Sequence, residues 1–138
     1  MDYARSVTLD LPYEQAVPTV KQALQAQGFG TLTEIDVRAT LKDKLGQDME
    51  PYVILGACNP QLAHRALGVD REMGLLLPCN VVVRATGKGT TLVQALDPQI
   101  MVSVPDRGAE LAPIAEEAGR RLQTALDALS SSPPRVLS

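Results

Sequence analysis

The stretch Pro-Tyr-Val-Ile-Leu-Gly-Ala-Cys-Asn-Pro, residues 51–60, decides the fold of this 138-residue chain. Its first seven residues form a short apolar run, which is typical of a strand inside a sheet with both faces covered. Asn59 followed by Pro60 is typical of a helix start, with Asn as the N-cap and Pro as the first helical residue. We therefore predict a central strand that leads directly into a short helix. The apolar stripe of that helix comprises Leu62, Ala63, Ala66 and Leu67.

The sequence before this stretch predicts a strand, a helix and a second strand. Residues 3–9 alternate as a strand does when its two faces have different surroundings, and apolar residues over 13–24 recur at helical spacing. Pro18 lies inside that helix, where a proline costs about 3 kcal/mol, so we expect the first turn to be kinked or separate. Alternation returns over 31–37, and a short helical piece over 40–46 follows.

The sequence after the stretch predicts further strands and a long helix. Residues 73–84 are strand-like on both sides of Pro78, so we expect a break, a bulge or an edge position at that proline. The Gly-Lys-Gly sequence at 87–89 predicts a turn, and residues 90–96 form the partner strand of a hairpin. Residues 111–129 contain the longest apolar stripe of the chain, which predicts a long amphipathic helix.

This order of elements, a strand, a helix, four further strands and a long helix, predicts an α+β fold. We expect an antiparallel sheet with the long C-terminal helix packed on one face. One domain is expected over residues 1–129 and a flexible C-terminal tail over 130–138. Because the strands predicted at 52–55 and 75–83 are apolar on both sides, we expect a homodimer that buries part of the other face.

Composition and charge exclude several classes of function. Apolar residues make up 45% of the chain and charged residues 21%, which is typical of a globular domain. Aromatic residues are scarce, at 3%, and the net charge is −3, so we expect no nucleic-acid binding. No apolar stretch approaches the roughly 20 residues that span a bilayer. The N-terminal residues lack the pattern of an export signal, so we expect a cytoplasmic protein with reduced thiols.

The two cysteines, which are the only thiols of the chain, occupy similar settings. Cys58-Asn59 precedes a proline at the end of one apolar run, and Cys79-Asn80 follows a proline inside another. Packing alone does not require this repeated choice of residues. The two Cys-Asn pairs are therefore the candidate site.

These pairs favour a pocket that binds a small molecule or an ion. In this hypothesis the four residues line the pocket, and Glu34 and Asp36 lie at its rim, because residues two apart on a strand share a face. A soft or borderline metal is one such ion, with both thiols as ligands and Glu34, Asp36 or His64 completing the shell. The sequence assigns no cofactor, no metal and no catalytic residue.

Two further hypotheses remain open. A thiol-dependent enzyme, redox protein or sulfur carrier would use Cys58 or Cys79, since the amides and the dipole of the helix after Cys58 can lower the pKa of a thiol. A structural or interaction homodimer would instead enclose both cysteines as inert, buried side chains, while Asn59 and Asn80 cap turns. Whether the chain is an enzyme stays open.

Four separated motifs occur in an order that resembles the DUF302 family of small bacterial and archaeal proteins. They are Gly28-Phe29-Gly30 with Thr33-Glu34-Ile35-Asp36-Val37, then Ile54-Leu55-Gly56-Ala57-Cys58-Asn59-Pro60, then Gly74-Leu75-Leu76-Leu77-Pro78-Cys79-Asn80-Val81, and finally Asp97-Pro98. The resemblance implies a homodimeric α+β domain whose topology is similar to that of the TATA-box-binding protein. It implies no established activity, and likeness of fold does not transfer DNA binding.

Overall fold

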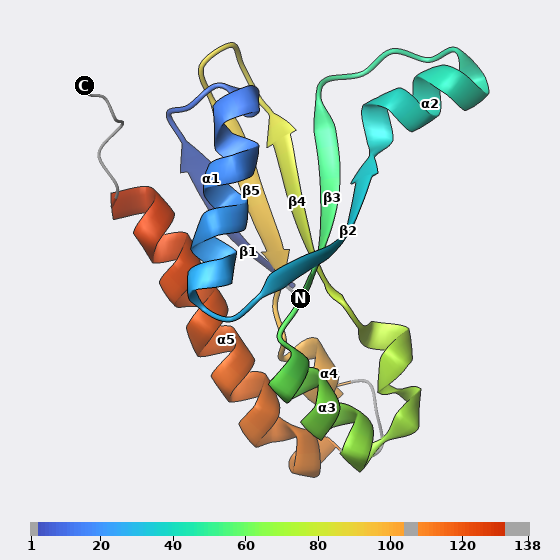
Figure 1. Ribbon diagram of the computed structural model, residues 1–138, viewed down its shortest axis with the longest axis vertical. Helices are drawn as coiled ribbons and strands as arrows, with labels where there is room; N and C mark the ends of the chain where they lie inside the picture. Colours follow the sequence, from blue (N-terminus) through green and yellow to red (C-terminus); the bar gives the residue numbers. More distant parts are fainter. Residues whose placement is uncertain (1–2, 104–107, 132–138) are drawn as a thin grey trace.

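The computed structural model describes residues 3–103 and 108–131, which form a five-stranded antiparallel sheet and the helices around it (Figure 1). The strand order across the sheet is β1-β5-β4-β3-β2. The strands are β1 (Ala4–Leu9), β2 (Gly30–Asp36), β3 (Tyr52–Cys58), β4 (Cys79–Ala85) and β5 (Thr91–Leu96). The helices are α1 (Tyr13–Ala26), α2 (Val37–Leu45), α3 (Pro60–Val69), the 3-10 helix η1 (Arg71–Leu76), α4 (Ile100–Ser103) and α5 (Gly108–Ser131). The predicted α+β class and the order of its main elements are confirmed.

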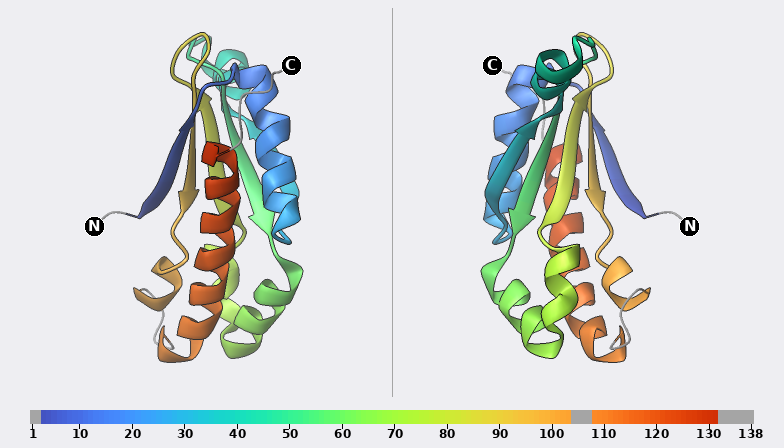
Figure 2. Two further views of the ribbon diagram at one scale, coloured as in Figure 1. Left: turned by 90° about the vertical axis from the view of Figure 1, so that its left-hand side faces the viewer. Right: turned by 90° about the vertical axis from the view of Figure 1, so that its right-hand side faces the viewer.

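One face of the sheet packs against α1 and α5 (Figure 2). Every second residue of the inner strands points to these helices, and Val53, Leu55 and Val83 are at most 3% exposed. Ile54 and Val82 point the other way and are only partly buried. Within one chain the strand over 51–57 is therefore covered on one face only, because the helices of the sheet layer lie on one side; coverage of its second face by another copy stays a prediction.

Helix α1 runs from Tyr13 to Ala26 through Pro18, so the first turn is not separate as the sequence suggested. Its buried stripe is Ala16, Val20 and Leu24. Pro18 itself is exposed on the other side of the helix. Burial of this stripe against the sheet, about 1.5–3 kcal/mol for each large side chain, offsets the backbone hydrogen bond that the proline removes.

A second core cluster lies beyond the end of the sheet, beneath the N-terminal half of α5 (Figure 1). Its buried residues are Leu62, Ala66, Met73, Met101, Leu111, Ile114, Ala115 and Ala118. The predicted strand over 73–77 is wrong, because η1 occupies this apolar run and buries Met73 in the cluster. Pro78 follows with a cis peptide bond, and β4 begins only at Cys79.

Two of the boundaries that differ from the prediction are the start of α2 and the end of α5. Helix α2 begins at Val37, three residues earlier than expected, because the Asp36 side chain accepts a hydrogen bond from Ala39 N and caps the helix. Helix α5 ends at Ser131, inside the predicted tail, and the rest of that tail, residues 132–138, lies outside the described residues. None of the helices within residues 3–103 and 108–131 combines the length and the apolar character that a membrane span requires.

Gly56 in β3 occupies a position where a larger residue does not fit. A Cβ atom there would overlap Thr33 Oγ1 of β2 and would lie 2.9 Å from Pro78 Cγ. We expect Gly56→Ala to lower the free energy of unfolding by about 1–3 kcal/mol through this overpacking. Urea denaturation followed by circular dichroism measures the change.

Two further variants test this explanation. Gly68→Ala in α3, where a Cβ atom would meet nothing within 4 Å, should raise the free energy of unfolding by about 0.5–1 kcal/mol. Adding Thr33→Ala to Gly56→Ala should restore part of the lost stability, because the clashing hydroxyl is gone. Equal stability of Gly56→Ala and the original chain would contradict the explanation.

Candidate functional site

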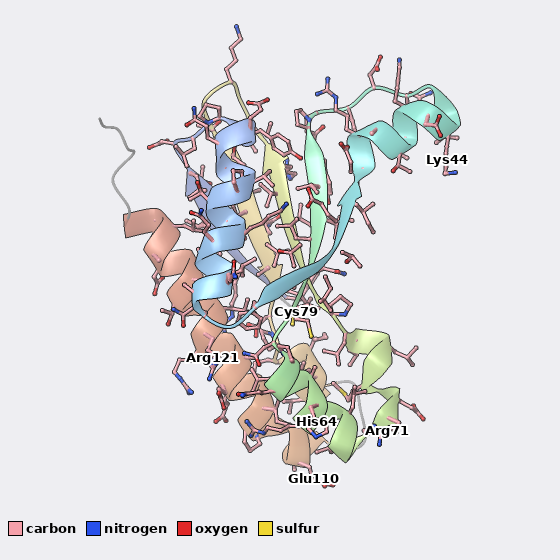
Figure 3. The ribbon with its side chains drawn as sticks, viewed as in Figure 1. Lys44, His64, Arg71, Cys79, Glu110 and Arg121 are labelled. Carbon is pink, nitrogen blue, oxygen red and sulfur yellow. The ribbon has the colours of Figure 1, made fainter. Side chains whose placement is uncertain are left out.

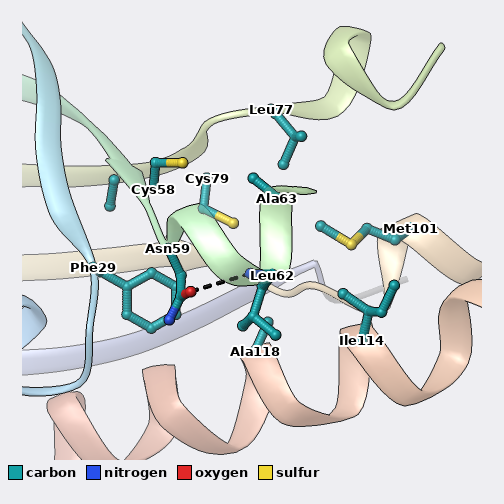
Figure 4. A pocket seen from close by; sticks show the side chains of 11 residues that line it. Phe29, Cys58, Asn59, Leu62, Ala63, Leu77, Cys79, Met101, Ile114 and Ala118 are labelled. Carbon is teal, nitrogen blue, oxygen red and sulfur yellow. Dashed lines mark hydrogen bonds between the residues drawn. The ribbon is translucent and has the colours of Figure 1, made fainter. Parts of the chain in front are cut away.

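A half-open pocket lies where the end of the sheet meets the second core cluster (Figure 4). Its cavity volume is about 20 Å³, which is room for about one water-sized sphere. The pocket lies on the seam between the two cores, since its residues come from both. It is lined by Phe29, Ala57, Cys58, Asn59, Leu62, Ala63, Leu77, Cys79, Met101, Ile114 and Ala118.

Both cysteines line this pocket because neighbouring strands end there. Cys79 is the first residue of β4 and pairs with Ala57 of β3, and Cys58 is the next residue after Ala57. Cys79 is buried, with 7% of its surface exposed, whereas Cys58 is half-buried. Both cysteines are free thiols. Two residues 21 positions apart in sequence thus share one pocket.

Asn59 holds the start of α3 beside the two thiols. Its side-chain Oδ1 accepts hydrogen bonds from Gln61 N and Leu62 N, each 3.1 Å long, so Asn59 is the predicted N-cap. On its other side, Gly28 has a φ of +88°, and a Cβ atom there would lie 2.8 Å from Asn59 Nδ2. The turn at Gly28 therefore needs glycine for its conformation and for this close approach. It places the next residue, Phe29, in the wall of the pocket.

The other predicted site residues lie elsewhere. Asn80 is exposed on β4, although it follows a pocket cysteine. Glu34 forms an ion pair with Lys21 of α1 at 2.5 Å, and Asp36 caps α2. His64 is exposed on α3 (Figure 3). Among the described residues, no group of three His, Cys, Asp or Glu side chains is placed to hold a metal ion.

The electrostatics of the pocket favour neutral thiols. Burial raises the pKa of Cys58, and burial together with the charge of Cys58 raises the pKa of Cys79 to about 11. The N-terminus of α3 does not reverse this effect, because Asn59 takes the free amides of the first turn. Both cysteines are therefore protonated at neutral pH.

Sequence reasoning missed most of the apolar wall. Met101 comes from α4, a four-residue helix that the sequence did not predict, and Ile114 and Ala118 come from α5. The apolar stripe of α5 predicted that Ile114 and Ala118 are buried, but it did not predict which residues they pack against. Only the Gly28-Phe29-Gly30 motif gave a local signal, since a glycine on each side marks Phe29 as a residue in a constrained turn.

The fold and the pocket define a small α+β domain with a one-sided antiparallel sheet and a sulfur-containing pocket at its end. The model of the DUF302 family, described as a domain of unknown function, matches residues 5–129, and the chain belongs to this family. It is similar to a solved structure described as an uncharacterized conserved protein DUF302 from Bacillus stearothermophilus. The two chains are 32% identical with a TM-score of 0.84, and the match covers 94% of this chain and 99% of the other. No curated protein matches the chain.

The thiol pKa values predict how the two cysteines react. An alkylating reagent attacks the thiolate, so a raised pKa slows labelling at neutral pH and makes the rate rise about tenfold per pH unit up to the pKa. We expect iodoacetamide to label Cys58 slowly at pH 7, with no plateau below pH 9, and Cys79 more slowly still. Mass spectrometry of the two cysteine-containing peptides measures both rates.

The unfolded chain is the control for this measurement. In denaturant the two cysteines should react at similar rates, because burial no longer separates them. A labelling rate of Cys58 that levels off below pH 8 in the folded protein would contradict the prediction and would favour thiolate chemistry.

Proposed function

We propose that this domain binds a small ligand or an ion in the pocket at the end of the sheet. The observation behind the proposal is that both cysteines and Asn59, from two separate parts of the sequence, line one half-open pocket. The remaining wall is apolar, as in most small-molecule sites, and a few polar groups lie among the apolar residues. Asn80, Glu34 and Asp36 are not part of this proposal, because they do not line the pocket.

The alternative of a thiol-dependent enzyme or carrier has less support. A nucleophilic cysteine needs a lowered pKa or an adjacent base. Burial raises the pKa of both thiols, and among the described residues no histidine, lysine or arginine lines the pocket. The alternative of two inert, fully enclosed cysteines has less support as well, since Cys58 is half-buried beside an opening.

Xenon is a probe for the pocket, because it enters small apolar cavities and needs no thiol chemistry. We expect xenon pressure to shift the amide resonances of Leu62, Ala63 and Ile114 in a ¹H–¹⁵N NMR spectrum. Ala63→Leu should abolish these shifts by filling the pocket. Ala109→Leu, at an exposed position of α5, should leave them unchanged. Shifts scattered over the surface, or none, would contradict a ligand-accessible pocket.

We also propose that the domain forms a homodimer through the arm formed by β2 and α2, residues 30–45. No residue of this arm is buried, although Leu32, Ile35 and Leu45 are apolar and 48–67% exposed. A nine-residue helix that buries none of its side chains fully is marginal in water. Ile35, Ile54 and Val82 pair in register and form an apolar row on the uncovered face of the sheet, beside the arm. A second copy would cover the row and the arm together.

Sedimentation velocity tests this assembly. We expect twice the 14.8 kDa mass of the chain at micromolar concentration, and Ile35→Glu should shift the protein to monomer. Leu75→Glu is the matched control, because Leu75 is an exposed leucine of η1, 84% exposed, at the other end of the molecule. A monomer at 100 µM, or equal effects of the two variants, would contradict the proposal. A cytoplasmic location, which would keep both thiols reduced, and the topology similar to the TATA-box-binding protein stay predictions.

A further inference from the structure

The buried side chain of Asn59 keeps one hydrogen-bond donor that the protein does not use. The residue is 6% exposed, and its Oδ1 accepts from Gln61 N and Leu62 N. Its Nδ2 has no acceptor within residues 3–103 and 108–131. Over the same residues, Arg5 Nε is the only fully enclosed side-chain nitrogen or oxygen without a hydrogen bond, so Nδ2 is not sealed from solvent. Since buried donors are normally satisfied by protein, water or a ligand, this amide is available to a molecule from outside.

Gly28 brings a second donor to the same place. A Cβ atom on Gly28 would lie 2.8 Å from Asn59 Nδ2 and 3.1 Å from Arg121 Nη1, so both nitrogens lie over this glycine. Two donors up to about 6 Å apart can share one acceptor oxygen, since each hydrogen bond is about 2.9 Å long. Gly28 is exposed, and Arg121 reaches it from α5 beside the turn that follows α1 (Figure 3).

Arg121 has hydrogen-bond donors left over after its contacts within the protein. Its Nη1 donates to Gln27 O over a long 3.4 Å, and its Nη2 pairs with Glu117 at 2.8 Å. A guanidinium group has five N–H donors, two of them on Nη1. Binding of Arg121 to the end of α1 and to Glu117 therefore leaves Nη1 with a hydrogen for a ligand.

The charges around Gly28 favour an anion. Glu117 also pairs with Arg65 at 3.1 Å, and the hydrogen bond from Arg65 lowers the pKa of Glu117. The charges of Arg121 and Arg120 lower this pKa further, so three guanidinium groups act on one carboxylate and positive charge is in excess. The N-terminal end of α3, a ten-residue helix capped by Asn59, also attracts an anion, whereas the C-terminal end of α1 opposes it.

We infer that Asn59 Nδ2 and Arg121 Nη1 together bind one oxyanion, the carboxylate or phosphate group of a small molecule, where α1 ends and α3 begins. Guanidinium and amide N–H groups are the donors that proteins use for such groups. Helix capping explains the contacts of Arg121 and of Asn59 Oδ1, but not the unused Nδ2. The site goes beyond the proposed pocket, although Asn59 belongs to both.

An NMR titration with inorganic phosphate tests the inference, with phosphate replacing chloride at constant ionic strength and pH 7. We expect the side-chain amide resonance of Asn59 and the backbone amides of Gly28 and Phe29 to shift and to saturate in the millimolar range. Acetate in the same titration separates a carboxylate from a phosphate. The anion that saturates at the lower concentration is the group that the site prefers.

Asn59→Asp removes the proposed donor but keeps the helix cap, because aspartate is as good an N-cap as asparagine. We expect phosphate binding at least about tenfold weaker, since a negative oxygen replaces a donor to a charged group. Arg121→Gln should weaken binding by a similar factor. The matched control is Arg71→Gln, which removes the same charge at an exposed position of η1 away from Arg121 (Figure 3). It should change the affinity less than about twofold.

Shifts that stay linear with phosphate concentration would overturn the inference, as would equal affinity in Asn59→Asp, Arg121→Gln and the original chain. An equal loss in Arg121→Gln and Arg71→Gln would also overturn it, because net charge alone would then explain the binding. If Asn59→Asp fails to fold, the two arginine variants decide the question. Xenon entry is a separate measurement, so failure of the pocket and failure of the oxyanion site are distinguishable.

Discussion

The length of α5 is the constraint on which the rest of the structure depends. Its 24 residues span about 36 Å, whereas a seven-residue strand such as β3 spans about 23 Å. The C-terminal half of α5 packs on the sheet, and its N-terminal half extends past the sheet end (Figure 1). An apolar stripe cannot stay in water over such a length, so α3, η1 and α4 cover the overhang. The second core and the pocket at the seam both follow from this difference in length.

The sequence predicted the parts of the fold that local pattern determines. The alternation of β1, the stripes of α1 and α5 and the hairpin between β4 and β5 needed only the period of the apolar residues. The strand predicted over 73–77 is wrong because a short apolar segment fits a buried helix as well as a strand. Which of the two forms here depends on packing against α5, which is distant in the sequence. Cys58, Asn59 and Cys79 were predicted as site residues because the repeated Cys-Asn pair is visible in the local sequence. Met101 and Ile114 were not predicted, because they reach the pocket only through long-range packing.

The position of Cys58 shows how a local signal can be outweighed. A thiol just before a helix is expected to gain stability as a thiolate from the helix dipole and from the free amides. Here Asn59 stands between the thiol and the helix, and its side chain accepts the hydrogen bonds of two of those amides. Desolvation then dominates, and the pKa of Cys58 rises. Burial thus keeps this thiol neutral, although it lies just before the start of a helix.

The pocket lies beside the start of β2, whereas the helical part of the arm, α2, follows the other end of this strand. Gly30, at the start of this strand, pairs with Cys58 beside the pocket, whereas Asp36, at its end, begins the exposed helix α2 (Figure 1). Seven residues of extended strand, about 23 Å, separate them. A second copy bound at α2 would therefore lie away from the pocket. Coupling between the sites would have to pass along β2 through its ladder with β3, the strand that also ends at the pocket.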